Sequence, residues 1–75
     1  MSLRDALLEA IKKHAEGHIE KHRVNVENLL QNNVGVAEHP DHIETIEKEL
    51  GIIAEYDDQL EMLNKYFVKK DPFKT

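Results

Sequence analysis

Two long stripes of apolar residues, separated by a single break, constrain this sequence more than any other feature. In the second stripe the apolar positions lie three or four residues apart, and this spacing places side chains on one side of an α-helix. Its members are Ile43, Ile46, Leu50, Ile53, Tyr56, Leu60, Leu63 and Phe67. The spacing therefore predicts a helix with a seam that packs against another helix, as in a coiled coil.

The first stripe runs from Leu3 to Leu30 and keeps one side of a helix apolar for about eight turns at 3.6 residues per turn. Ser2 precedes Asp5 by three residues, which resembles a capping box and predicts a helix start. Gly17 interrupts the pattern, but a helical glycine costs only about 1 kcal/mol relative to alanine. The helix is therefore expected to continue through it.

The stretch "QNNVGVAEHPD" is the one strong break in the chain. Asn32, Asn33 and Gly35 tolerate the left-handed conformation that closes a helix, and Pro40 suits the first turn of the next one. The final "KKDPFKT" is charged and contains Pro72, so it is expected to fray. The predicted elements are a helix over about 2–33, a loop over about 34–39, a helix over about 40–68 and a tail over 69–75.

Two helices of similar length, joined by a short loop, predict an all-α fold: a single domain, residues 1–75, that forms an antiparallel helical hairpin. A 75-residue chain with no cysteine has no disulfide to supplement a small core. Two helices also leave the far side of each seam uncovered, so we expect homo-oligomerisation into a four-helix-type bundle. A homodimer is the simplest assembly and a tetramer the next, and an unidentified protein is the other candidate partner. The predicted interface consists of Leu7, Ile11, Ala15, His18, His22, Val26, Leu29, Ile43, Ile46, Leu50, Ile53, Tyr56, Leu60, Leu63 and Phe67.

His14, His18 and His22 recur every fourth residue in "KKHAEGHIEKHR". Three imidazoles at this spacing could bind Zn²⁺, Ni²⁺ or Cu²⁺, so a metal-binding bundle is the alternative reading of the chain. No Glu in the sequence is followed three places later by His, as the carboxylate-bridged di-iron bundles require. We therefore expect no metal and no other cofactor, with the histidines as polar members of the helical interface.

On a helical wheel, His18 and His22 fall within the apolar arc. Counting back from the loop places His22 opposite Gly51, which has no side chain to donate a charge. We therefore expect these imidazoles to be buried without a carboxylate partner. The alternative is that Glu55 or Asp57 reaches one of them.

His39 and His42, in "EHPDH", flank the predicted start of the second helix, with His39 as the candidate cap. Protonated imidazoles are disfavoured at the positive end of a helix, and the neighbouring Asp41 and Glu44 account for the local charge without an ion. Both histidines are expected to be solvated at the tip of the hairpin.

Catalytic chemistry finds few candidate groups in this sequence. Cysteine is absent, the only Ser and Thr residues are Ser2, Thr45 and Thr75, and no phosphate-binding loop or nucleophile motif occurs. A thin hairpin also provides no obvious pocket that excludes water. We therefore expect that the chain is not an enzyme.

The charge and hydropathy patterns argue against two further classes of protein, nucleic-acid binders and membrane-spanning or secreted proteins. A net charge of −5 without interleaved basic and aromatic residues argues against a nucleic-acid binder. No apolar run approaches the roughly 20 residues that span a bilayer, and Asp5 and Glu9 interrupt the segment where a secretory signal would be apolar. The expectation is a soluble protein of the cytoplasm.

The run "VGVAEHPDHIETIEKELGIIAEYDDQLEMLNKYF", and the chain as a whole, resemble short uncharacterised proteins of marine cyanophages and marine metagenomes. The resemblance extends over most of the length. It implies a viral or host-cytoplasmic setting but no established activity, since that group carries no motif from which a site residue could be transferred. The sequence is thus interpreted as a small self-associating interaction or structural module.

Overall fold

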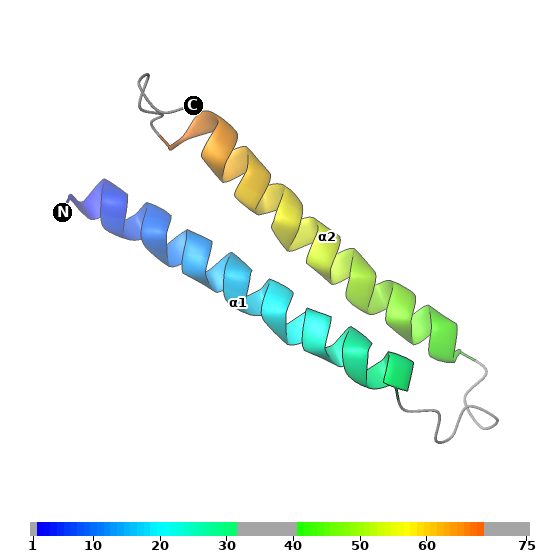
Figure 1. Cartoon of the computed structure of the whole chain (residues 1–75). Coiled ribbons are helices and arrows are strands. Elements are labelled where there is room, and N and C mark those ends of the chain that lie inside the picture. The colour runs from blue at the N-terminus through cyan, green and yellow to red at the C-terminus, as the bar shows by residue number, and fades with distance from the viewer. Residues whose placement is uncertain (1, 32–40, 69–75) are drawn as a thin grey trace, which may run out of the picture.

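The computed structural model describes residues 2–31 and 41–68. Within these ranges the chain forms two helices, α1 (Leu3–Gln31) and α2 (His42–Tyr66), which pack against each other as an antiparallel pair (Figure 1). The predicted all-α hairpin is therefore confirmed, and its assembly into a larger bundle stays a prediction. The predicted loop over 34–39 and the predicted tail over 69–75 lie outside the described residues.

The start of α1 has the predicted cap. The Ser2 hydroxyl oxygen accepts a hydrogen bond from the backbone N–H of Asp5 at 3.0 Å, and the Ser2 carbonyl accepts one from the N–H of Ala6 at 3.0 Å. Asp5 adds a negative charge to the first turn, where the helix dipole is positive. These contacts satisfy backbone groups that a helix start otherwise leaves unpaired.

Asp41 occupies the position before α2, and its side chain accepts no capping hydrogen bond from the first turn of the helix. Its carbonyl oxygen accepts from both the backbone N–H and the hydroxyl of Thr45, at 2.9 and 3.1 Å. The predicted cap, His39, lies outside the described residues. At the other end Phe67 is the C-cap, and its backbone N–H donates to the Leu63 carbonyl at 3.0 Å. The last residue of α2 is therefore Tyr66, two residues before the predicted boundary of 68.

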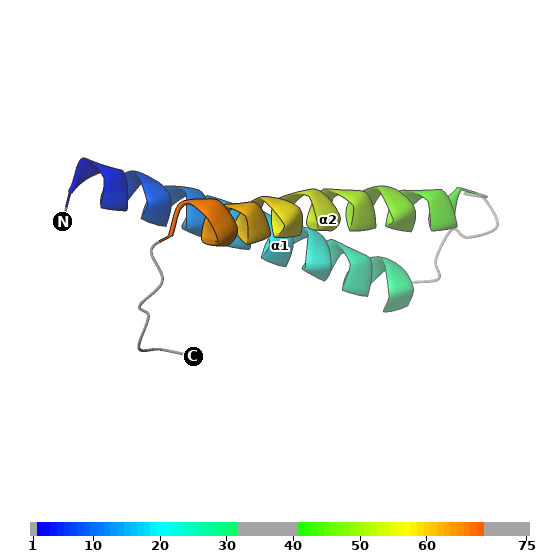
Figure 2. The ribbon, with the colours of Figure 1, turned by 90° about the horizontal axis from the view of Figure 1, so that it is seen from above.

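Three cross-helix contacts define how the two helices are aligned. Arg4 donates to the carbonyl of Phe67, His22 contacts Glu49, and the His42 ring contacts the carbonyl of Leu29. In each pair the residue numbers add up to 71, so one register holds from end to end. Seen from above, the helices cross at a shallow angle, as in coiled coils and most four-helix bundles (Figure 2).

The hairpin is a single layer of helices with almost no interior. The molecule measures 54 × 24 × 15 Å, and its smallest dimension is little more than the diameter of one helix, about 10–12 Å. Among the described residues Ala15 is the only buried hydrophobic residue, with 1% exposure. Ten large apolar side chains are more than 40% exposed: Leu3, Leu7, Ile11, Val24, Leu30, Ile43, Leu50, Tyr66, Phe67 and Val68. No helix in the described ranges is long and apolar enough to cross a membrane.

Both helices continue through a glycine, as predicted for Gly17. A Cβ atom added to Gly17 or Gly51 would meet no other atom within 4 Å. Replacing either glycine with alanine is therefore expected to stabilise the fold by about 1 kcal/mol, because alanine loses less backbone entropy in a helix. Thermal melts of the two variants test this, with Ala54→Gly as the reverse substitution at an exposed position of α2. A lower melting temperature for both alanine variants would contradict the open surroundings of the two glycines.

Candidate functional site

The three histidines of α1 form a row along the seam between the helices. Their four-residue spacing places the imidazoles on one side of α1, where Tyr56 of α2 meets them. The His18 ring stacks on the Tyr56 ring, with centroids 4.6 Å apart and planes at 10°. His14 packs edge-on against His18 at 4.5 Å, and the His22 ring lies 6.1 Å beyond His18. Imidazole and phenol rings thus occupy positions that aliphatic side chains fill in an ordinary helical seam.

The environment of His18 disfavours its charged form. Desolvation lowers the pKa of His18 below its usual 6.5, and the neighbouring charges of His14, Lys21 and His22 lower this pKa further. A neutral imidazole stacks on Tyr56 without the cost of removing a charge from water. The expectation for His18 is a buried ring without a carboxylate partner; the ring is half-buried, and no carboxylate in the described part of the chain acts on it.

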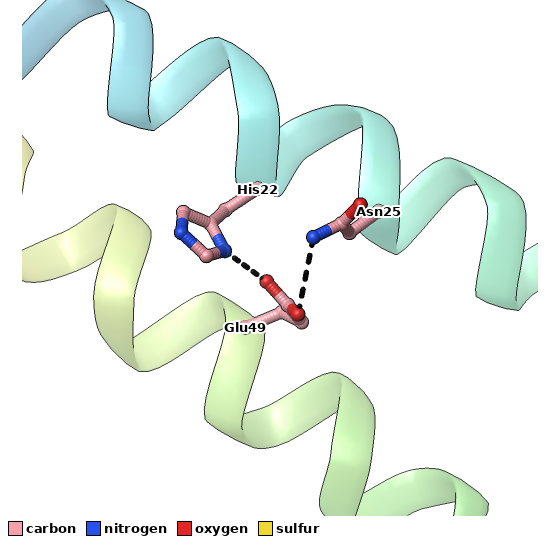
Figure 3. A network of polar contacts seen from close by, with 3 residues as sticks. All are labelled: His22, Asn25 and Glu49. Atoms are coloured by element: carbon pink, nitrogen blue, oxygen red, sulfur yellow. Dashed lines mark hydrogen bonds and ion pairs between the residues drawn. The ribbon is translucent and has the colours of Figure 1, made fainter.

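His22 belongs to a polar cluster that crosses the hairpin (Figure 3). Its Nδ1 atom contacts Oε2 of Glu49 on α2, and the Nδ2 amide of Asn25 donates to Oε1 of the same carboxylate at 3.2 Å. The side chains of His22 and Glu49 are only 12% and 19% exposed. The hydrogen bond from His22 holds the pKa of Glu49 below its usual range, against the opposing effect of desolvation, and the bond from Asn25 adds to it.

The prediction that His22 lies opposite Gly51 is wrong. The register of the hairpin places Glu49 beside His22, two residues closer to the start of α2, so this imidazole has a carboxylate partner. That carboxylate is neither Glu55 nor Asp57, the two alternatives considered. A signal was present in the sequence, because Glu49 is three residues after Ile46 and four before Ile53, and so belongs to the seam itself.

The expectation of a solvated His42 is also wrong. This side chain is partly buried, and its Nε2 lies 2.8 Å from the carbonyl oxygen of Leu29, to which a protonated Nε2 donates. The contact ties the first residue of α2 to the last turns of α1, where helix carbonyls lack partners within the helix. His39 lies outside the described residues.

The metal hypothesis requires several side chains placed to bind one ion, and the described part of the chain contains no such set. In residues 2–31 and 41–68 no group of three or more His, Asp or Glu side chains is arranged to hold a metal ion. A shallow hollow beside His14 and His18 is also lined by Lys13 and Lys21, whose positive charges oppose a bound cation. His22 directs Nδ1 to Glu49.

The predicted interface residues divide into two groups. Ala15 is buried, and nine others are half-buried between the helices: His18, His22, Val26, Leu29, Ile46, Ile53, Tyr56, Leu60 and Leu63. Five remain exposed: Leu7, Ile11, Ile43, Leu50 and Phe67. Half-buried residues that the predicted interface does not include are Leu8, Ile19, Asn25, His42, Glu49, Ile52 and Met62.

A shallow hollow near the start of α1 shows which side chains share one face of the hairpin. Its lining residues are Asp5, Leu8, Glu9 and Lys12 of α1, Leu63 and Asn64 of α2, and Val68. Since 18 residues make about five turns, residues 18 positions away lie on the same side of each helix. Leu8 and Lys12 thus correspond to Val26 and Leu30, and Asn64 corresponds to Ile46, with Ile43 and Leu50 one turn to either side. We call Val26, Leu30, Ile43, Ile46 and Leu50 the apolar face.

Most of the apolar face is open to solvent in the single chain. Leu30 is 59% exposed, Ile43 72% and Leu50 50%, while Val26 and Ile46 are half-buried. Single exposed apolar residues are normal on protein surfaces, but several of them on one face of two neighbouring helices are typical of an interaction site. Comparison of the chain with protein-family models, curated proteins and solved structures finds no match.

Proposed function

We propose that this chain is a non-catalytic, self-associating helical module, in which two hairpins join through their apolar faces to form a four-helix bundle. The observation that carries the proposal is the single-layer architecture, with one buried hydrophobic residue, Ala15, in the described ranges and the apolar face uncovered. A second layer of helices supplies the missing side of the core. A two-fold dimer is the simplest closed form, and a tetramer is the next.

Surface area is consistent with a dimer of this size. The chain exposes 6306 Å², whereas a compact monomer of 8.7 kDa exposes about 4,700 Å². A standard interface removes about 800 Å² from each partner, and the difference between these two areas is larger than that. Burying the apolar face therefore brings the exposed area per chain closer to that of an ordinary small protein.

The biological setting is the second part of the proposal. The resemblance to short proteins of marine cyanophages supports a viral module that acts in the cytoplasm of the host. Self-association would there provide a small bundle with an acidic surface, to which a further protein could bind.

Light scattering coupled to size-exclusion chromatography tests the assembly. At micromolar concentration the expected mass is about twice the 8.7 kDa of one chain, decreasing on dilution as the dimer dissociates. A monomer at high micromolar concentration that is fully helical and melts cooperatively would contradict the proposal.

Elemental analysis of the same peak tests the metal alternative. This alternative requires that the unmodified protein contains stoichiometric metal, and that the metal is lost when His18 and His22 are replaced with alanine.

A further inference from the structure

The distribution of charge between the two helices bears on how two hairpins pair, and this inference rests on the proposed self-association. The five acidic residues of α1 are balanced by five basic ones, so its net charge is zero. In α2 seven acidic residues stand against two lysines, which gives a net charge of −5. One helix of the hairpin is therefore electrically neutral and the other is strongly acidic.

A two-fold axis can relate two hairpins in a four-helix bundle in two ways. When the axis runs along the bundle, both hairpins point in the same direction, and each α2 lies across from the α1 of the partner. When the axis runs across the bundle, the hairpins point in opposite directions, and α2 lies across from α2 along its length. Neighbouring helices are about 8–10 Å apart, close to the screening length of about 8 Å at physiological salt, so facing acidic helices repel each other more than diagonal ones.

We propose that the partner of the apolar face is a second copy in the same orientation, with the Gln31 and His42 ends of both hairpins together. This arrangement separates the two acidic α2 helices diagonally and places each one beside a neutral α1. In the opposite orientation the two α2 helices lie next to each other, and each of them carries seven acidic residues. Charge complementarity thus selects one of the two geometries.

The position of Lys12 supports the same orientation. Lys12 lies on the same side of α1 as Leu30, five turns earlier, and the hairpin register makes it level with Gln59. Asp57 and Glu61, seven and eleven residues after Leu50, continue the side of α2 that carries the apolar face. In the same-direction dimer Lys12 lies between the partner subunit's Asp57 and the partner subunit's Glu61, where opposite charges attract.

Distances between spin labels distinguish the two orientations. Because the chain contains no cysteine, a single introduced cysteine carries one nitroxide label. Asn28→Cys and Ala6→Cys place labels at exposed positions near opposite ends of α1, about 33 Å apart along the rod. A dimer in the same orientation gives short distances for the Asn28→Cys and Ala6→Cys homodimers, and a longer one when the two labelled chains are mixed.

The reverse pattern, with long distances within each labelled variant and a short distance in the mixed sample, would overturn this orientation while leaving self-association intact. A sample with no dipolar coupling between chains, and the mass of one chain by light scattering, would instead overturn the proposed function. Gly17→Cys, near the middle of α1, is the matched control, because its label distance is short in both orientations.

Discussion

Replacing Leu50 with glutamate is expected to convert the protein to a monomer at concentrations where the unmodified chain is a dimer. Leu50 lies in the apolar face and is 50% exposed in the single chain, so a partner is needed to bury the rest of its side chain. Burying the exposed half of a leucine stabilises by about 0.8–1.5 kcal/mol, half the value for a whole side chain, and a two-fold dimer contains the residue twice. The expected loss of affinity is therefore at least about ten- to a hundredfold, and burying the glutamate charge increases it. Light scattering over a dilution series measures this loss.

Val24→Glu is the control for this substitution. Val24 has the same exposure, 50%, but it lies two residues before Val26 and so on the opposite side of α1 from the apolar face. The two variants introduce the same charge into equally exposed helical positions, so their difference reports the location of the interface. Equal dissociation by both variants, or an unchanged mass for Leu50→Glu, would contradict an interface at the apolar face.

The architecture was predictable because each step of the argument used local information. The spacing of apolar residues in α2 requires only that the segment be helical with one buried side. The cap at Ser2 depends on a spacing of three residues, and Gly17 costs too little to stop a helix of this length. None of these inferences depends on which residues of one helix contact which residues of the other.

The polar cluster could not be predicted for the opposite reason. A shift of two residues between the helices moves them by about 3 Å, and apolar side chains would find similar neighbours in either alignment. The same shift replaces Gly51 with Glu49 beside His22 and changes an unpaired imidazole into a paired one. Polar partners therefore depend on the register, which hydrophobic periodicity alone leaves open.

The boundaries of the seam show a related effect on α1. The apolar stripe is wide enough to include both Leu7 and Leu8, yet in the structure Leu8 is half-buried and Leu7 is 55% exposed. A single neighbouring helix covers only part of a wide apolar stripe. A stripe wide enough to contact several helices therefore contains more residues than a two-helix hairpin buries. The exposed remainder is what the proposed assembly would cover.

Acid is expected to destabilise the protein in two separable steps, and Glu49 controls the lower one. The hydrogen bond from His22 places the folded pKa of Glu49 below the ordinary value of 4.5, so the unfolded chain binds more protons as the pH falls through that value. The contribution of Glu49 is therefore present above pH 4.5 and is lost as the pH falls through the folded pKa. Because His18 has a folded pKa below 6.5, its contribution is present above pH 6.5 and decreases on acidification below it.

Thermal melts between pH 8 and pH 3 test both steps at constant protein concentration. Glu49→Gln is expected to be less stable than the unmodified protein at pH 7, since it removes the charged acceptor of His22 and Asn25, and to show a smaller loss below pH 4.5. His18→Gln removes the group that titrates in the upper window, so the loss just below pH 6.5 should shrink in that variant alone. Glu47→Gln removes the same charge as Glu49→Gln from an exposed position of α2 two residues away. If Glu47→Gln and Glu49→Gln changed the acid transition equally, the effect would come from the net charge of α2 and the contact with His22 would have no part in it.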